Sequence, residues 1–270
     1  MSATDPLLCL HERPGLARFD LPAELRHRYG GDVGFAEECL YANFVSTIDG
    51  IVAIPSLPRS NTLIADASEA DRFVMGLLRA CADVVLVGCG TVLASPGGRW
   101  RAGTVFPALA TSFEELRRSL GHEGDAPVAI VTGRGSLPPD HPVLEDGAIV
   151  LTTRLGESVM RGRLPGTAEI EVVGGEDTVD VAEAVAALHA RGYGRILSEA
   201  GPRLFSSLAA AGLVDELFLT ISPFVAGRPT GEERLSLAEG AGLFPEHRVG
   251  RELLSARLHG DHLFLRYSTA

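Results

Sequence analysis

Four apolar residues in a row, 84–87, are followed by Gly88, Gly90 and Thr91, and this stretch most constrains the fold. A short β-branched run closed by a glycine is typical of a strand buried on both faces of a sheet, so we predict a central strand here. The glycines leave bare backbone at its carboxyl end, and the Thr91 hydroxyl can bond a phosphate or a ribose. Open α/β sheets bind ligands at that edge. A tight turn explains an isolated Gly-x-Gly-Thr as well, and other stretches of the chain decide between the two.

Charge and composition exclude several classes of partner. The 270 residues are 46% hydrophobic, and 24 basic against 35 acidic residues give a net charge of −11. Without a basic run the chain is not expected to bind nucleic acid, and a small molecule is the expected partner. No window approaches the roughly 18 apolar residues of a membrane span, so we expect no membrane contact and a cytoplasmic location. The four cysteines show no C-x-x-C pairing and no nearby His at metal-ligand spacing, so we expect neither a metal nor a disulfide.

Strand and helix patterns alternate along most of the chain. Residues 1–38 are poorly periodic and indicate a partly irregular arm with one short helix near 23–27. Residues 39–270 are predicted to form one α/β domain with a mixed sheet, because no linker or repeat interrupts the alternation. A loop is expected at 55–66. The expected strands are 40–47, 84–87, 128–132, 148–152, 170–173, 195–198, 214–223, 251–258 and 262–267, the last two as an antiparallel hairpin.

One helix and one further junction carry polar residues near this sheet. The helix is predicted to begin at Ser68, which with Asp71 resembles a capping box. Arg79 lies near its end, where a cation stabilises the macrodipole. The junction is Glu199-Ala200-Gly201-Pro202, which follows the strand 195–198. Pro202 suits a first helical turn, so Gly201 occupies the cap, where free N–H groups can hold an anion.

Five stretches together resemble one known family. They are Asn43-x-x-Ser46-Thr47-Ile48-Asp49-Gly50, Leu78-Arg79-Ala80-x-Ala82-Asp83, Gly88-x-Gly90-Thr91-Val92, Glu199-Ala200-Gly201-Pro202, and Val214-Asp215-Glu216-Leu217 ending in Ser222-Pro223. In this order they resemble the C-terminal reductase domain of the bifunctional riboflavin-biosynthesis deaminase-reductase (RibD). The resemblance implies a three-layer fold like that of dihydrofolate reductase, with helices on both faces of a mixed, mostly parallel sheet. It also implies a reductase that uses NADPH to open the ribosyl ring of 5-amino-6-(5-phosphoribosylamino)uracil, with hydride delivered to the sugar C1 carbon.

The resemblance also implies roles for individual residues. The catalytic group would be Asn43, Asp49 and Glu199. The substrate side would hold Asn61, Arg79, Arg99, Arg101 and Glu199, with arginine for the ribose phosphate and Glu199 for the pyrimidine N–H groups. We predict that Arg79 and Glu199 hold opposite ends of one substrate. The cofactor side would hold Val45, Thr47, Leu63, Gly88, Gly90, Thr91, Ser95, Gly201, Pro202, Arg203 and Leu204.

Two further predictions concern the cofactor and the assembly. The chain lacks a Gly-x-Gly-x-x-Gly fingerprint with its ribose-binding acid, but Thr132 and Arg134 follow a strand and are placed to meet a 2′-phosphate. We therefore expect NADPH to be preferred over NADH. We also expect a homodimer, because the strand 217–221 and the terminal pair 253–267 supply more sheet edge than a monomer can cover.

Two departures from the family pattern are visible. Ser95 stands where an acidic residue is common in the family, so a substrate contact through that acid is absent. No His-x-Glu with Pro-Cys-x-x-Cys occurs, so the zinc deaminase half is absent and we expect a stand-alone reductase.

Two alternatives remain open. A dihydrofolate or pterin-type reductase has the same fold, and a carboxylate on the helix that faces the ring would favour it. Asp66, Glu69 and Asp71 lie near that place but resemble capping residues. A nucleotide-binding module without turnover is the alternative of another class, and an assay of cofactor oxidation separates it from an enzyme.

Overall fold

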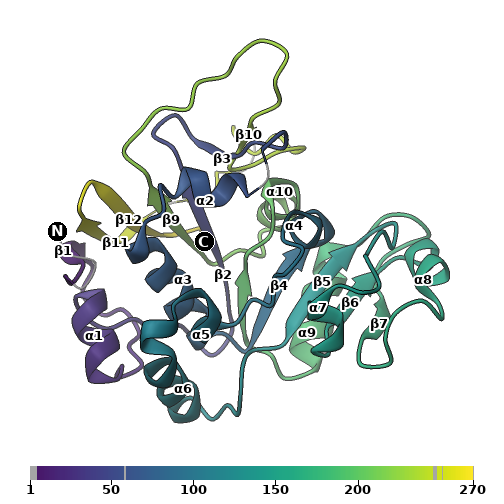
Figure 1. Ribbon diagram of the computed structural model, residues 1–270, viewed down its shortest axis with the longest axis horizontal. Coiled ribbons are helices and arrows are strands. Elements are labelled where there is room, and N and C mark those ends of the chain that lie inside the picture. The colour runs from purple at the N-terminus through teal and green to yellow at the C-terminus, as the bar shows by residue number, and fades with distance from the viewer. Residues whose placement is uncertain (1–4, 58, 246–247, 251, 270) are drawn as a thin grey trace.

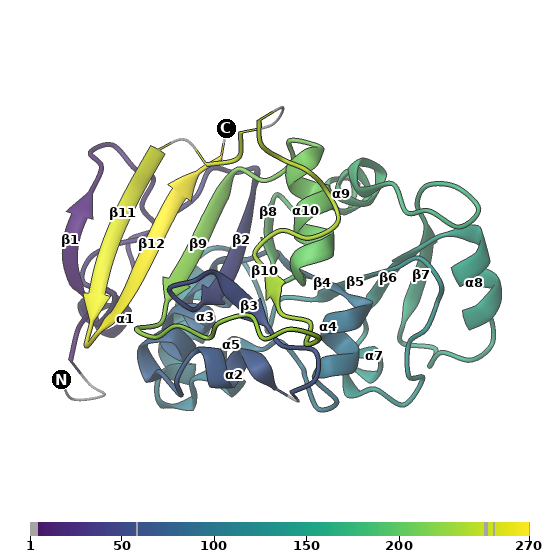
Figure 2. The ribbon, with the colours of Figure 1, turned by 90° about the horizontal axis from the view of Figure 1, so that it is seen from above.

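The computed structural model describes residues 5–57, 59–245, 248–250 and 252–269, and a ten-stranded sheet runs through it (Figures 1 and 2). The predicted positions Pro58 and Arg251 and the ends of the predicted arm and domain, 1–4 and 270, lie outside these residues. The strands lie in the order β1 (Leu8–Glu12), β11 (Glu252–His259), β12 (His262–Ser268), β9 (Glu216–Ile221), β2 (Cys39–Ser46), β8 (Arg195–Ser198), β4 (Val84–Gly88), β5 (Val128–Thr132), β6 (Ile149–Thr152) and β7 (Glu169–Val172).

The sheet is mixed, and its parallel part is larger than its antiparallel part. Pairing is parallel from β9 through β2, β8, β4, β5 and β6 to β7, and antiparallel from β1 through β11 and β12 to β9. Residues 84–87 of β4 are buried and lie between β8 and β5, which confirms the predicted central strand. The C-terminal antiparallel hairpin and the mixed sheet are confirmed as well.

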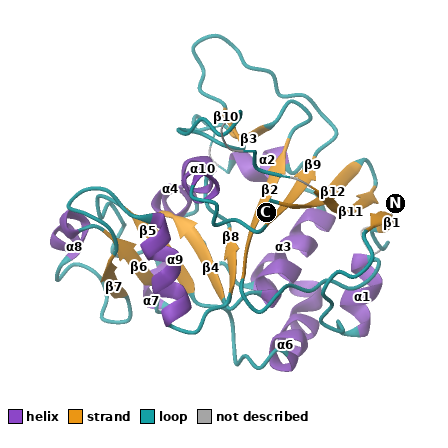
Figure 3. Cartoon of the chain, turned by 180° about the vertical axis from the view of Figure 1, so that it is seen from behind, coloured by secondary structure: helices purple, strands orange, loops and turns teal. Residues whose placement is uncertain are grey.

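Helices cover both faces of this sheet (Figure 3). On one face, α1 (Ala23–Tyr29), α3 (Glu69–Cys81), α5 (Ala102–Val105), the short 3-10 helix η1 (Pro107–Leu109), α6 (Ala110–Ser119), α7 (Pro142–Glu145) and α8 (Arg154–Met160) contribute to one apolar cluster. On the other face, α9 (Val181–Ala190) and α10 (Pro202–Ala210) build a second cluster around Phe205 and Leu188. The short helices α2 (Ser60–Ile64) and α4 (Cys89–Ala94) follow the strands β3 (Ile51–Ala53) and β4. This is the predicted three-layer arrangement.

The structure corrects the predicted outline at several short elements. The segment 55–66 was expected to be a loop, but it contains α2. The N-terminal segment contains β1, which pairs with β11. Leu8 and Leu10 of β1 are exposed, so this edge strand is held by backbone pairing and shows no buried alternation that a sequence pattern could reveal. A separate two-stranded sheet of β3 (Ile51–Ala53) and β10 (Leu235–Ser236) was also not predicted.

The reason given for a homodimer is corrected by the topology. β9 lies between β12 and β2, and β11 is covered by β1, so neither strand offers a free edge. The free edges are those of β1 and β7. The homodimer itself stays a prediction.

Neither a membrane span nor a metal cluster is found in the described part of the chain. Within these residues no helix is long and apolar enough to cross a bilayer. The same residues contain no group of three or more His, Cys, Asp or Glu side chains placed to hold a metal ion.

Candidate active site

Four neighbouring parallel strands, β2, β8, β4 and β5, end at the same edge of the sheet, and two of them lead directly into helices. Gly88 is the N-cap of α4, and Gly90 and Thr91 lie in its first turn. The stretch therefore begins a short helix and is not the isolated tight turn that the sequence also allowed. Gly201 is the N-cap of α10. A Cβ on Gly201 would lie 3.7 Å from the Thr91 hydroxyl oxygen, and one on Gly90 would meet nothing within 4 Å. The two predicted ligand junctions therefore lie side by side.

The N-terminus of α10 fits a bound anion. Pro202 occupies its first turn, and no side chain caps it. The backbone N–H groups of Arg203 and Leu204 thus have no intrahelical partner, and the helix dipole places positive charge there. Gly201 keeps this end free of a side chain, and the helix is nine residues long. The pyrophosphate of a dinucleotide suits such donors.

Arg79 and Glu199 form a bidentate ion pair in this region. Arg79 Nε donates to Glu199 Oε1 and Arg79 Nη2 donates to Glu199 Oε2, each at 2.7 Å, and the side chains are 10% and 11% exposed. A third donor, Arg79 Nη1, reaches the carbonyl oxygen of Arg101 at 3.4 Å. The structure thus brings the two residues together, as a shared site requires. In the absence of a ligand they are bonded to each other. Their roles toward a substrate stay predictions.

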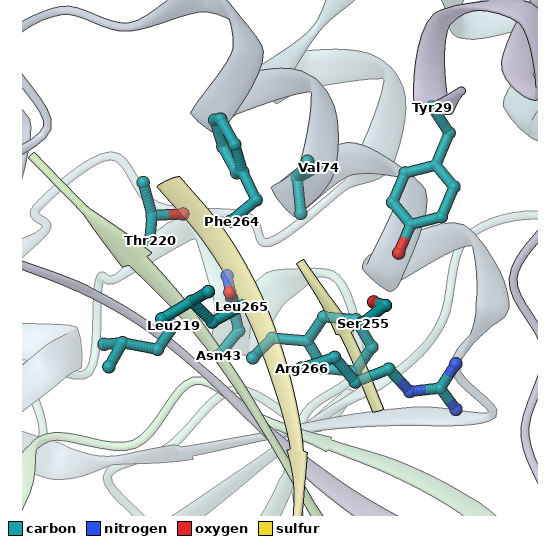
Figure 4. A pocket seen from close by; sticks show the side chains of 10 residues that line it. Tyr29, Asn43, Val74, Leu219, Thr220, Ser255, Phe264, Leu265 and Arg266 are labelled. Atoms are coloured by element: carbon teal, nitrogen blue, oxygen red, sulfur yellow. The ribbon is translucent and has the colours of Figure 1, made fainter. Parts of the chain in front are cut away.

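Asn43 lies on the same face of the sheet as this ion pair. Tyr41 belongs to the apolar cluster under α3, and side chains alternate along a strand, so Asn43 points toward α3. Its side chain lines a small hollow with Thr220 of β9 and Val74 of α3 (Figure 4). No described residue hydrogen-bonds its amide, so the donor and the acceptor are free for a ligand.

The predicted residues Thr47 and Asp49 form a turn that is bonded to the loop at Ala226 and Gly227. The Thr47 hydroxyl donates to Asp49 Oδ1 at 2.6 Å and accepts from the N–H of Ile51. The backbone N–H groups of Ala226 and Gly227 donate to the Asp49 carboxylate. These bonds, the one from Thr47 foremost, lower the pKa of Asp49 to about 2. The geometry gives Asp49 a positioning role, and its predicted catalytic role is untested.

Arg99 and Arg101 are engaged with acidic residues. Both guanidinium groups pair with Asp146, at the end of α7, and Arg101 also lies 3.5 Å from Asp125. Ser95 ends α4, and its carbonyl oxygen lies 2.9 Å from His141 Nε2. His141 Nδ1 accepts from the N–H of Val143, so the ring carries its proton on Nε2 and donates it to Ser95. Arg99 pairs through Nη1 and Arg101 through Nε and Nη2, so each guanidinium keeps further N–H donors for a ligand.

The remaining predicted residues lie farther out or beside the junctions. Asn61 and Leu63 are exposed on α2, and Arg203 is exposed and pairs with Glu233. Leu204 lies beside Gly88. Val45 pairs with Thr220 across β2 and β9. Thr132 is buried at the end of β5, and Arg134 is exposed just beyond it.

Three residues of this region were missed by the sequence analysis: Thr220, His141 and Asp146. Thr220 lies inside a predicted strand with no neighbouring motif, and the other two lie between predicted elements. Their importance comes from contacts between segments far apart in the chain, which no local pattern encodes.

Comparison with known proteins identifies the family. The family model described as RibD C-terminal domain matches residues 38–240. The chain is 29% identical over 195 residues, 70% of this chain and 82% of the relative, to the 2,5-diamino-6-ribosylamino-4(3H)-pyrimidinone 5′-phosphate reductase of Archaeoglobus fulgidus.

Solved structures show the same fold. A pyrimidine reductase-like protein from Corynebacterium diphtheriae superposes with a TM-score of 0.66 at 21% identity, covering 86% of this chain and 92% of that one. A diaminohydroxyphosphoribosylaminopyrimidine deaminase/5-amino-6-(5-phosphoribosylamino)uracil reductase from Thermotoga maritima gives 0.60 at 20% identity, over 86% and 57% of the two chains. The chain therefore belongs to the RibD C-terminal domain family.

Proposed function

We propose that this protein is an NADPH-dependent reductase of a ribosylaminopyrimidine phosphate, of the type that acts in riboflavin biosynthesis, with residues 39–270 as one reductase domain. The observation that carries the proposal is the convergence of three features on one sheet edge. These are the bare junctions at Gly201 and Thr91, the partly buried Arg79–Glu199 pair, and the amide of Asn43, which has no hydrogen-bond partner among the described residues. The family membership supports the same reaction.

The residues divide between cofactor and substrate. The N–H groups at the start of α10 and the Thr91 hydroxyl are the donors for the cofactor phosphates. NADPH, when bound, supplies the hydride that the sugar C1 carbon accepts. The ring bond from C1 to the sugar oxygen breaks, that oxygen gains a proton, and a ribityl chain results. Asn43, between the two sides, orients the ribosylamine, and positioning is the main demand of such chemistry.

The Arg79–Glu199 pair forms the substrate side. With both oxygens bonded to Arg79, the side chain of Glu199 is held rigidly in place. Its remaining lone pairs can accept from pyrimidine N–H groups. The third donor of Arg79, Nη1, is bonded to the carbonyl oxygen of Arg101. The name of the relative from Archaeoglobus fulgidus gives a substrate with a 2-amino ring. The name of the structural neighbour from Thermotoga maritima gives a substrate with a uracil ring. Both rings are candidates for this chain.

A pterin-type reductase is a second candidate, and one observation favours it. Asp71 was expected to cap α3, yet the residue is buried in the structure, with 5% of its surface exposed. A carboxylate in that place suits a pterin ring. Dihydrofolate therefore belongs in the same assay as the two ribosylaminopyrimidine phosphates.

The test follows NADPH absorbance with each substrate, and we expect oxidation with a ribosylaminopyrimidine phosphate. Oxidation with dihydrofolate alone would shift the assignment to the second candidate, and tight NADPH binding without any turnover would indicate a binding module.

Arg134 tests the preference for NADPH. It is exposed beyond β5 and has no ion pair with a described residue, so its guanidinium is free for a 2′-phosphate. Arg134→Ala should lower the NADPH to NADH ratio of kcat/KM by about tenfold. The matched control is Arg161→Ala, at the C-cap of α8, which should leave the ratio unchanged. An Arg134→Ala enzyme with an unaltered ratio would contradict the assignment.

A further inference from the structure

Two histidines flank the turn of the C-terminal hairpin. The sequence His259-Gly260-Asp261-His262 joins β11 to β12, and His259 pairs with His262 across the two strands. Paired residues of neighbouring strands project their side chains on one face of the sheet, with Cβ atoms about 4.5–5.5 Å apart. The two imidazole rings are therefore neighbours.

Both rings hold a nitrogen away from water without a hydrogen bond. The Nε2 atoms of His259 and His262 are buried, and no described residue bonds either of them. Each residue as a whole is only half-buried, so the Nε2 end of each ring is the end that enters the protein. A buried polar atom without a partner is costly, and in a native protein it calls for an explanation such as a bound ion.

The two rings lie on the face of the sheet that carries α1 and α3. Arg257 and Phe264 are the cross-strand pair two residues further from the turn. Arg257 Nε donates to the carbonyl oxygen of Tyr29, at the end of α1, and Phe264 belongs to the apolar cluster under α3. Because side chains alternate along a strand, His259 and His262 share this face.

A third buried polar atom without a described partner lies at the next position of the sheet. Continued by one residue, the register of β12 and β9 places Ser222 opposite His262. Ser222 lies two residues beyond Thr220, which lines the hollow of Figure 4, so it is on the same face. Ser222 is fully buried, and no described residue bonds its hydroxyl oxygen. The row His259, His262 and Ser222 thus crosses three strands at the edge where β9 ends (Figure 2).

The chemistry of this row favours a transition-metal ion. Neutral imidazole nitrogen is a ligand for zinc, copper and nickel, whereas Mg²⁺ and Ca²⁺ take oxygen. Zn²⁺ binds histidine nitrogen at about 2.0–2.1 Å and holds water in positions that the protein leaves open. A hydroxyl beside the ion can bond such a water. Arg257, two residues before His259, is paired with Glu12, so its charge is balanced.

We propose that His259 and His262 form a two-histidine site for a divalent transition-metal ion, with Ser222 bonded to a water on that ion. Two ligands are fewer than the groups of three sought above among the described residues, so the ion keeps open positions for water. The site lies outside residues 38–240, which the family model matches, and it does not rest on the proposed function. Only the cysteines were weighed for a metal from the sequence, so this His-x-x-His spacing was passed over.

Calorimetric titration of the protein with Zn²⁺ near neutral pH tests the site. We expect one Zn²⁺ per chain, a melting temperature that rises with the Zn²⁺ concentration, and no binding of Mg²⁺. His259→Ala and His262→Ala should each lower the Zn²⁺ affinity by about tenfold or more, because the remaining imidazole is a single ligand. Ser222→Ala should lower it by about threefold, through the lost water contact. The matched control is His27→Ala, an exposed histidine on α1, which should change none of these values.

Other outcomes would overturn the proposal. Heats that do not saturate, Mg²⁺ binding as strong as that of Zn²⁺, or an equal loss in His27→Ala would show adventitious binding at the surface. Should the alanine variants melt early without metal, His259→Gln and His262→Gln keep most of the side-chain volume, and full Zn²⁺ affinity in these folded variants would refute the site. Unchanged affinity in Ser222→Ala would remove Ser222 from it. None of these measurements involves NADPH turnover, so their failure leaves the proposed function untouched.

Discussion

The ion pair of Arg79 and Glu199 contributes to the stability of the fold, and the proposed function also places it on the substrate side. Removal of either partner would leave the other charge buried, at a cost of about 3–5 kcal/mol in comparable pairs. Loss of activity in a single variant at either position therefore does not by itself identify a substrate contact. Both KM and the free energy of unfolding must therefore be measured for the variants at each position.

Asp71 should make the stability of the protein depend on pH. Its pKa, 3.8 when exposed, is about 6 in the folded state, so the folded protein holds a proton that the unfolded chain releases between these values. The free energy of unfolding should therefore fall as pH rises from 4 to 6, by at most roughly 3 kcal/mol, and the fall should be complete above that window.

Denaturant unfolding of the wild type and of Asp71→Asn across pH 4 to 7 checks this. The variant cannot ionise at this position, so its stability should fall less over the range, and Glu69→Gln should behave like the wild type. Identical slopes in the wild type and Asp71→Asn would show that Asp71 does not ionise with a raised pKa.

Single residues could be predicted from the sequence only where a local motif marks them. Gly201 and Thr91 follow strands at recognisable junctions, and the structure places them together. Asp71 was assigned to the cap because its spacing from Ser68 fits one, and its burial depends on the tertiary packing of α3, which no local pattern encodes. The engagement of Arg99 and Arg101 by Asp146 likewise depends on a contact between distant segments.

The proposed cofactor site depends on the N-terminal end of α10. Gly201 has φ −68° and ψ 169°, which alanine adopts without strain, and an added methyl would meet its nearest neighbour at an ordinary 3.7 Å. Gly201→Ala should therefore fold normally, with a melting temperature within about 2 °C of the wild type, while the methyl obstructs the anion site. We expect NADPH affinity to fall by about tenfold or more.

The control is Gly166→Ala, at another open glycine, before β7, which should change neither quantity. Unchanged NADPH affinity in a normally folded Gly201→Ala protein would move the phosphates away from α10.

Whole elements were predictable where burial imposes a pattern. β4, β5 and β8 are buried runs, and their predicted bounds agree with the structure to within a residue. β1 is exposed along most of its length, and α2 has one buried residue, so neither carries an apolar periodicity. These short surface elements form because the rest of the fold offers them a partner.

At the scale of the whole molecule, the homodimer is the main untested prediction. The edge of β1 carries the exposed Leu8 and Leu10, and an unpaired edge with apolar side chains is a surface that proteins commonly cover. Light scattering at micromolar concentration should give twice the mass of the chain. Leu10→Lys should shift the mass toward the monomer, and Leu155→Lys, an exposed leucine on α8, should not. A monomeric wild-type protein would contradict the prediction.

The transfer of hydride to the sugar tests the central claim most directly. NADPH deuterated at the transferred position is mixed with excess protein and a ribosylaminopyrimidine phosphate, and the product is analysed by mass spectrometry. The proposed function predicts one deuterium at C1 of a ribityl chain for each NADPH oxidised. Unchanged ribosyl substrate, or deuterium found only in a reduced pterin supplied in a parallel reaction, would contradict it.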